Sequence, residues 1–119
     1  GLAFAAWNGL PGALVKWFLA SLGPAGLCRL LHHESNRAAT AITVFAHCDG
    51  GPPRTFVGAV AGVIVAEPRG DQGFGWDAIF QPLGSFHTFA EMAPEEKDRF
   101  SMRRLAVEQL QAAGVLARE

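Results

Sequence analysis

Residues 38–67, AATAITVFAHCDGGPPRTFVGAVAGVIVAE, contain two β-strand patterns separated by a strong turn signal. Residues 38–48 combine β-branched and aromatic side chains, and residues 54–67 form a longer run that is apolar on both faces. The Asp-, Gly- and Pro-containing link at 49–53 is short, so the pair is predicted to be an antiparallel hairpin. A strand that is apolar on both faces is expected in the middle of a sheet covered by helices. Glycines inside the second strand indicate a bulge or a close packing partner.

Helical patterns precede the hairpin. In the first of them, Trp17 and Phe18 lie on one apolar face at helical spacing, and both are expected in the core. The Gly-Pro pair at 23–24 ends this helix, and residues 25–31 form a second short one. The polar residues 32–37 are expected to be a solvated connection to the hairpin.

Shorter elements are predicted at the two ends of the chain. Residues 1–7 suit a buried strand or loop, and residues 78–80 suit a brief strand. A helical turn at 94–99 begins with a proline, whose missing N–H is tolerated in the first helical turn. Ser101 is a good N-cap, which predicts a separate helix over residues 102–113.

The 119 residues are expected to form one domain, 1–119, because a chain of this length with 50% apolar residues can bury a single core. The predicted class is α/β, with a mixed, partly antiparallel sheet covered by helices. Ten basic and eleven acidic side chains leave no strong field, which argues against binding to nucleic acid or to an anionic membrane. No apolar run is long enough to cross a bilayer, and the first residues lack a signal-peptide pattern.

The cysteines and histidines form no recognisable metal or disulfide pattern. Cys28 and Cys48 are neither a CxxC pair nor a framework, so they are expected to be buried, inert thiols in a reducing cytoplasm. The four histidines are scattered without ligand spacing, and no protein-caged metal is predicted. The chain has no nucleophile elbow, no Walker A loop and no GxGxxG string.

The stretch most informative for function is 70–104, GDQGFGWDAIFQPLGSFHTFAEMAPEEKDRFSMRR. Phe74 and Trp76 alternate with glycines, among them Gly75, and Asp77 follows directly. Aromatic faces beside a few directed polar groups suit a planar nucleobase, and residues without a Cβ allow a ligand to approach the backbone. The alternative is a tight turn with two core aromatic rings.

A second polar group follows about twenty residues later, where Lys97, Ser101 and Arg103 occupy a helical segment. These side chains could form a solvated helix face. On one continuous helix, however, Arg103 would lie on the apolar side, where an unpaired guanidinium is costly. Asp77 or a ligand could then be its partner.

Several strings, taken in order, closely resemble the inosine triphosphate pyrophosphatase family. They are GLPG at 9–12 with KWF at 16–18, GVI at 62–64 with PRG at 68–70, GFGWDAIF at 73–80, TFAEM at 88–92, EEK at 95–97 and SMR at 101–103. This resemblance implies hydrolysis of purine nucleoside triphosphates to monophosphate and pyrophosphate with Mg²⁺, with the deaminated ITP, dITP and XTP as preferred substrates. A cytoplasmic location is expected from the cysteine pattern, and a homodimer is expected if a sheet edge is left uncovered. Substrate binding would fall to Phe74, Gly75, Trp76, Asp77, Lys97, Ser101, Met102, Arg103 and Lys16. The aromatic loop would hold the nucleoside, residues 101–103 the base edge, and Lys16 the cleft near the phosphates.

The chain departs from the family pattern in three respects. It lacks a match to the [ST]-G-N-x-x-K triphosphate loop and to the acidic metal ligand, and it opens with the Gly1-Leu2 that ends the D-[ST]-G-L motif of the general base. The resemblance therefore covers the C-terminal two-thirds of the family, with no catalytic residue and no metal ligand assigned. Met102 replaces a family histidine, which affects discrimination of the 6-oxo purine, and Ala78 replaces a proline.

Two hypotheses follow from this pattern. In the first, the chain is the C-terminal portion of a nucleoside triphosphate pyrophosphatase and alone hydrolyses inosine triphosphate very slowly or not at all. In the second, it is a catalytically inactive, truncated homologue that acts as a nucleotide-binding or self-associating module. An uncovered sheet edge and apolar surface would favour pairing with another copy.

Overall fold

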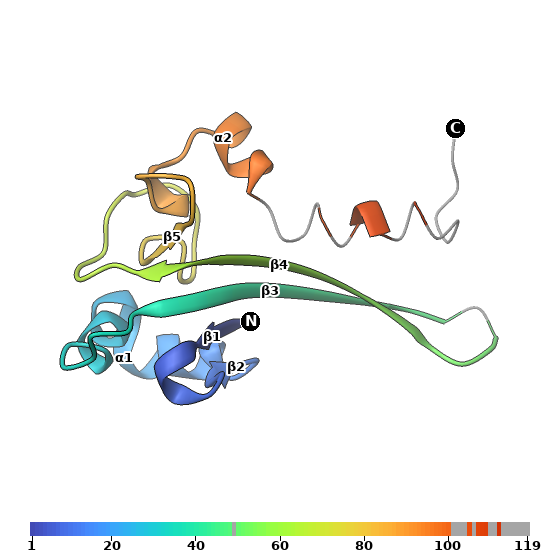
Figure 1. Cartoon of the computed structure of the whole chain (residues 1–119), viewed down its shortest axis with the longest axis horizontal. Helices are drawn as coiled ribbons and strands as arrows, with labels where there is room; N and C mark the ends of the chain where they lie inside the picture. Colours follow the sequence, from blue (N-terminus) through green and yellow to red (C-terminus); the bar gives the residue numbers. More distant parts are fainter. Residues whose placement is uncertain (49, 101–104, 106, 110–111, 113–119) are drawn as a thin grey trace.

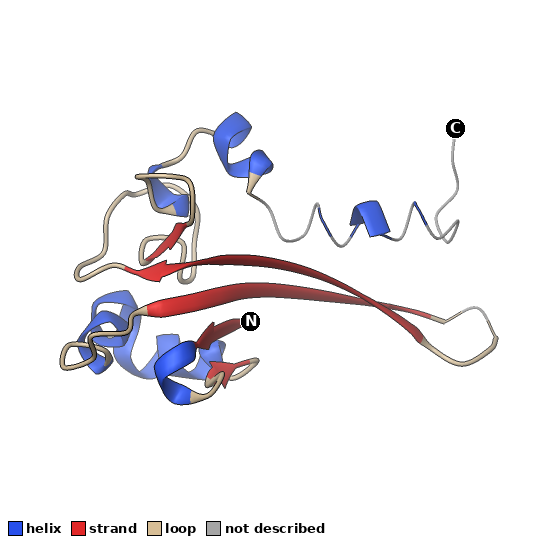
Figure 2. Ribbon diagram, viewed as in Figure 1, coloured by secondary structure: helices blue, strands red, loops and turns tan. Residues whose placement is uncertain are grey.

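The computed structural model describes residues 1–48, 50–100, 105, 107–109 and 112, and Figure 2 distinguishes its helices and strands. The elements are β1 (Leu2–Phe4), the 3-10 helix η1 (Ala5–Trp7), β2 (Pro11–Gly12), α1 (Val15–Leu30), β3 (Ala38–His47), β4 (Arg54–Ile64), β5 (Phe80–Pro82), the 3-10 helix η2 (Phe89–Glu91) and α2 (Pro94–Arg99). The strands form one sheet in the order β2-β1-β3-β4-β5, and each described pairing is antiparallel. The predicted α/β class is confirmed.

The predicted hairpin is the β3–β4 pair, which runs in register from Ala38 opposite Val63 to His47 opposite Arg54. Its other neighbours, β1 and β5, pair only near the end remote from the turn, so the turn half extends beyond them (Figure 1). The expectation that the second strand is buried on both faces is therefore wrong for this half. Val57 remains 43% exposed, although its N–H donates to Gln109 Oε1 at 3.3 Å and its carbonyl accepts from Gln109 Nε2 at 2.7 Å.

The predicted helix, break and second helix are confirmed within α1, where Gly23 adopts a non-helical φ of 70° just before Pro24. The second half is the more deeply buried, with Leu27 and Cys28 in the core, while the first half contributes Val15. Phe18 packs against that core, with its ring 6.3 Å from the Trp7 ring. The prediction that Trp17 also lies in the core is wrong, because its side chain is 66% exposed. Fewer residues of the first half of α1 face the core than the apolar pattern predicts.

Arg37 corrects the prediction that 32–37 is a solvated connection. Its guanidinium is half-buried and donates to four backbone carbonyls. At the end of α1 the acceptors are Leu31 O at 2.7 Å and Cys28 O at 3.3 Å. At the end of β4 they are Ile64 O and Val65 O, both at 2.7 Å. One cation thus joins the end of the helix to the end of the long strand.

The remaining core comes from the segment that follows β4. Ile79, Phe80, Phe89 and Met92 are almost fully buried. The strand expected at 78–80 begins later, at Phe80, and lies against Gly62: a Cβ at Gly62 would come within 2.6 Å of Phe80 Cζ. The sequence-based expectation of a close packing partner is confirmed at this glycine.

The C-terminal helical turn is confirmed as α2, with Pro94 at its start. Residues 105, 107–109 and 112 are helical, as the pattern predicts for 102–113. The predicted site residues Ser101, Met102 and Arg103 lie outside the described residues. No helix in the described part of the chain is both long and apolar enough to cross a membrane.

The two cysteines differ in exposure, which partly contradicts the prediction that both thiols are buried. Cys28 is buried, and burial raises the pKa of its thiol. Cys48 is exposed near the hairpin turn. The structure therefore contains one inert thiol and one accessible thiol.

Candidate nucleotide-binding site

The loop between β4 and β5 is fixed by backbone hydrogen bonds. Arg69 N–H donates to Ala78 O at 2.8 Å, which closes the base of the loop. Gln72 N–H donates to Ala90 O at 3.0 Å, and Ala90 N–H donates to Asp77 O at 3.0 Å. Because Ala90 is buried in η2, the loop is attached to the core on both sides of its aromatic tip.

Asp77 is the buried anion of this loop, at 8% exposure. Its Oδ2 accepts hydrogen bonds from Lys97 Nζ at 2.8 Å and from Phe74 N–H at 3.2 Å. Gly73 has a φ of 79°, and a Cβ at this position would collide with the Asp77 carboxylate. The glycine therefore allows the loop to fold back over the anion, and the ammonium of Lys97 compensates its burial.

The two aromatic side chains of the loop have different environments. Phe74 is 84% exposed and presents its ring to solvent, while Lys97 Nζ lies 6.0 Å from the ring centroid. Trp76 is half-buried, with its ring 5.6 Å from Phe80 and 6.1 Å from Phe89. Phe74 is therefore free to stack on a ligand, whereas Trp76 mainly supports the loop from the core side.

A pocket of about 190 Å³ lies at this loop. It is lined by Gly70, Asp71, Gln72, Gly73, Phe74, Gly75, Asp77, Ala78 and Ala90. The structure thus brings together Phe74, Gly75, Asp77 and Lys97 from the predicted set, with Trp76 behind them. Lys16 is exposed on α1 and does not line this pocket; its Nζ lies 5.8 Å from the ring of neighbouring Trp17.

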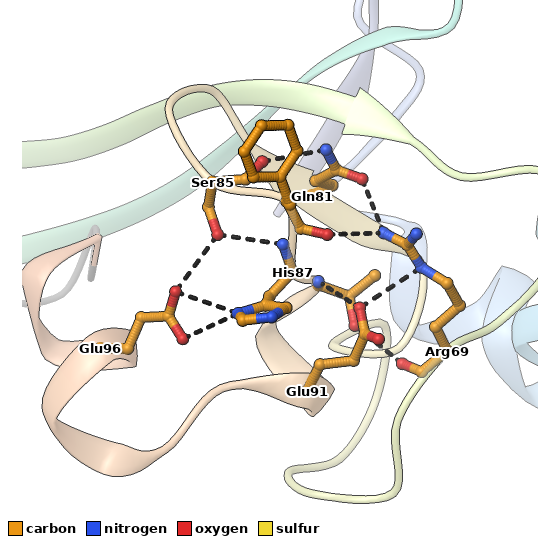
Figure 3. A network of polar contacts seen from close by, with 8 residues as sticks. Arg69, Gln81, Ser85, His87, Glu91 and Glu96 are labelled. Atoms are coloured by element: carbon orange, nitrogen blue, oxygen red, sulfur yellow. Dashed lines mark hydrogen bonds and ion pairs between the residues drawn. The ribbon is translucent and has the colours of Figure 1, made fainter.

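Sequence reasoning missed the polar groups that hold the opposite side of the loop. Thr88 is fully buried and its Oγ1 donates to Arg69 O at 2.7 Å, while Glu91 Oε1 accepts from Thr88 N–H at 2.9 Å. This hydrogen bond lowers the pKa of Glu91, and Arg69 Nε, 3.3 Å from Glu91 Oε1, lowers it further (Figure 3). The Thr-x-x-Glu spacing of a capping box was the available signal.

The described residues do not fit a magnesium site. They contain no group of three or more His, Cys, Asp or Glu side chains that could hold a metal ion. The buried carboxylate of Asp77 already accepts from an ammonium and a backbone N–H. The local arrangement suits recognition of an aromatic, charged organic ligand better than metal coordination.

Comparison with known proteins places these residues in a family. The Ham1 family matches residues 1–113, and this chain belongs to it. The chain is 48% identical to inosine triphosphate pyrophosphatase of Yarrowia lipolytica over 112 residues, which are 92% of this chain and 58% of that protein. It is 45% identical to dITP/XTP pyrophosphatase of Methanopyrus kandleri over 109 residues, with 91% and 58% of the two chains covered.

Two solved structures have folds similar to that of this chain. A HAM1 protein from Coxiella burnetii superposes with a TM-score of 0.87 at 31% identity, covering 98% of this chain and 64% of that one. A nucleoside-triphosphatase / dITP/XTP pyrophosphatase from Mycobacterium abscessus superposes with a TM-score of 0.80 at 34% identity, with coverages of 92% and 62%. The chain spans about three-fifths of the length of these relatives.

Proposed function

We propose that this chain binds the nucleoside part of a deaminated purine nucleoside triphosphate in a pyrophosphatase. The reaction would convert ITP, dITP or XTP to the monophosphate and pyrophosphate. Support comes from family membership and from relatives that are named inosine triphosphate or dITP/XTP pyrophosphatases. Because the chain spans 58% of those relatives, the activity of a whole family protein is part of the proposal.

The observation that carries this proposal is the arrangement of Phe74, Asp77 and Lys97. An exposed ring offers a stacking face for a purine, and a cation lies 6.0 Å from the same ring. Asp77 holds that cation at 2.8 Å from a position fixed by the core. A nucleotide combines an aromatic base with negative phosphates, so both groups have a complementary partner in it.

The proposal gives the described residues binding roles and no chemical step. Family resemblance implies Mg²⁺, which would neutralise charge developing on the phosphates when bound. Since the described residues do not fit that ion, their contribution is to stack on the base and to orient the nucleotide. The homodimer and the reducing cytoplasm remain parts of the same proposal, and the two unpaired cysteines suit such a compartment.

A second candidate function is nucleotide binding without hydrolysis. It is favoured by the buried carboxylate of Asp77, whose Oδ2 already accepts hydrogen bonds from the Lys97 ammonium and from the Phe74 N–H. Both candidates use the same pocket, but only the first leads to hydrolysis of the bound nucleotide. Pyrophosphate release from inosine triphosphate with Mg²⁺ separates them when it is measured on this chain joined to the N-terminal motifs of a family relative. Only the first candidate predicts release there, whereas the chain alone is expected to hydrolyse the substrate very slowly or not at all.

The shared binding step is tested by calorimetric titration of the chain with inosine monophosphate. We expect Phe74→Ala to weaken binding by about tenfold, since stacking of one base on an aromatic ring contributes about 1–3 kcal/mol. Phe86→Ala is the matched control, because Phe86 is also a highly exposed phenylalanine, at 90%, but does not line the pocket. Equal affinity of the two variants would refute the assigned stacking role.

A further inference from the structure

A second polar cluster joins the loop before η2 to the helix that carries Lys97. His87 Nδ1 lies 3.0 Å from Glu96 Oε1 and 3.2 Å from Glu96 Oε2 (Figure 3). Ser85 Oγ lies 3.3 Å from Glu96 Oε2 and accepts the N–H of His87 at 3.0 Å. With a proton on Nδ1, the ring donates to this carboxylate whether it is neutral or charged. We call His87, Glu96 and Ser85 the α2 clasp.

The helix needs such an anchor because it is weak by itself. α2 has six residues, none of them buried, and its N-cap Ala93 makes no side-chain capping bond. Isolated helices of this length are unstable in water, so its position depends on tertiary contacts. Glu96 is the residue directly before Lys97, and any displacement of Glu96 therefore moves the attachment point of the ammonium.

We propose that the α2 clasp positions Lys97. By fixing Glu96 to the loop at 85–87, it holds the Lys97 ammonium against Asp77 and beside the exposed ring of Phe74. The clasp residues do not contact the proposed ligand pocket and act through Lys97. The structural part of this inference stands independently, while its effect on the ligand rests on the proposed function.

Other charged groups beside the clasp do not replace it. Glu91 and Arg69 form their own ion pair at 3.3 Å, and Arg69 also donates to Gln81 Oε1 at 2.6 Å and to Phe86 O at 3.3 Å. These contacts stabilise the loop on the η2 side. Glu96 bonds α2 to Ser85 and His87, and on the far side Lys97 bonds it to Asp77. The clasp therefore acts together with the packing of the C-cap Phe100 against the core to keep α2 from swinging about that pair.

Competitive acetylation of lysine amines tests the positioning directly. The chain contains two lysines, Lys97 and the exposed Lys16, so Lys16 reports any general loosening within the same sample. Peptide mass spectrometry after brief treatment with acetic anhydride gives the ratio of Lys97 to Lys16 labelling. In the unaltered protein this ratio is expected to be below one, because Lys97 is held by Asp77.

Loss of the clasp is expected to raise the labelling ratio by about threefold, the effect of weakening one partly exposed ion pair. Glu96→Ala and His87→Ala both remove the clasp. Glu95→Ala is the matched control, because it removes the same charge from the same first turn at an exposed position. His87→Asn places an amide donor near the Nδ1 position and is expected to restore most of the original ratio. An unchanged ratio in Glu96→Ala and His87→Ala, or an equal rise in Glu95→Ala, would overturn the proposal.

Titration with inosine monophosphate separates this inference from the proposed function. If the unaltered protein binds, Glu96→Ala is expected to weaken binding by about threefold while Glu95→Ala does not. If the labelling ratio changes but no variant binds, the positioning role is supported and the nucleotide role is refuted. If all variants bind equally and label equally, the proposed function survives and the positioning role fails.

Discussion

Removal of the Arg37 side chain should destabilise the protein far more than its position in a polar segment suggests. The Arg37→Ala substitution deletes four hydrogen bonds from one guanidinium, three of them at 2.7 Å. It also leaves the carbonyls of Ile64 and Leu31 without that donor. These acceptors belong to the end of β4 and the end of α1, so the change loosens the junction of the sheet and helix.

The magnitude follows from the geometry. A hydrogen bond to a charged group contributes about 1.5–3 kcal/mol when its loss leaves a buried partner unsatisfied. Arg37 is half-buried, its bond to Cys28 O is long at 3.3 Å, and water can reach part of the site. Such contributions are also not additive within one network. We therefore expect Arg37→Ala to lower the free energy of unfolding by about 3 kcal/mol.

Urea denaturation followed by circular dichroism measures this difference. Arg29→Ala is the matched control, since Arg29 is exposed in the last turn of α1 and should contribute less than about 1 kcal/mol. Arg37→Lys should recover only part of the loss, because one ammonium cannot reach carbonyls on both sides as the planar guanidinium does. If Arg37→Ala and Arg29→Ala lower the unfolding free energy equally, the assigned role of Arg37 is wrong.

Two further predictions concern the packing and the pH response of the loop region. Gly62→Ala should lower the free energy of unfolding by about 1–3 kcal/mol, because the added methyl would lie 2.6 Å from Phe80 Cζ and against the Gln81 carbonyl; thermal unfolding that matches the unaltered protein would contradict this contact. Folding lowers the pKa of Glu91, so its carboxylate stabilises the fold at pH values above its ordinary pKa of 4.5. This stabilisation disappears as the pH falls through the lower pKa of the folded state. Urea titrations between pH 7 and 3 should therefore show a smaller acid-induced loss of stability in Glu91→Gln, and identical slopes would exclude Glu91 as a contributor.

Local sequence signals predicted the elements of the fold but not how they are covered. The turn at 49–53 and the break at Gly23 are properties of a few adjacent residues, and both appear where expected. Exposure of Trp17 and Val57 depends on which distant elements reach them, and an apolar pattern carries no such information. The burial of the polar residue Arg37 was equally unpredictable from local sequence, because its acceptors are separated from it by up to 28 residues.

The site was predictable to the extent that it depends on loop chemistry. The glycine-aromatic-glycine-aromatic-Asp run indicated a folded-back loop, and the positive φ of Gly73 over the Asp77 carboxylate confirms why glycine is needed there. The division between an exposed Phe74 and a supporting Trp76 depends on Phe80 and Phe89, which no local pattern connects to them. The resemblance to known motifs predicted a binding role for Lys97, whereas its contact with Asp77 became apparent only in three dimensions.

The two halves of the Asp77–Lys97 pair are held with different strengths, and this asymmetry follows from their supports. Asp77 belongs to a loop bonded on both sides to Ala90 of η2, so moving its backbone would require breaking hydrogen bonds to a buried residue. Lys97 belongs to a six-residue helix without a buried residue, and the ion pairs that hold this part of the helix, His87–Glu96 and Lys97–Asp77, are partly exposed. Exposed polar contacts contribute little each, so the cation moves at lower cost than the anion. The ring of Phe74 and the carboxylate of Asp77 thus form a fixed platform, and the position of the Lys97 charge above it is the variable that contacts around α2 can tune.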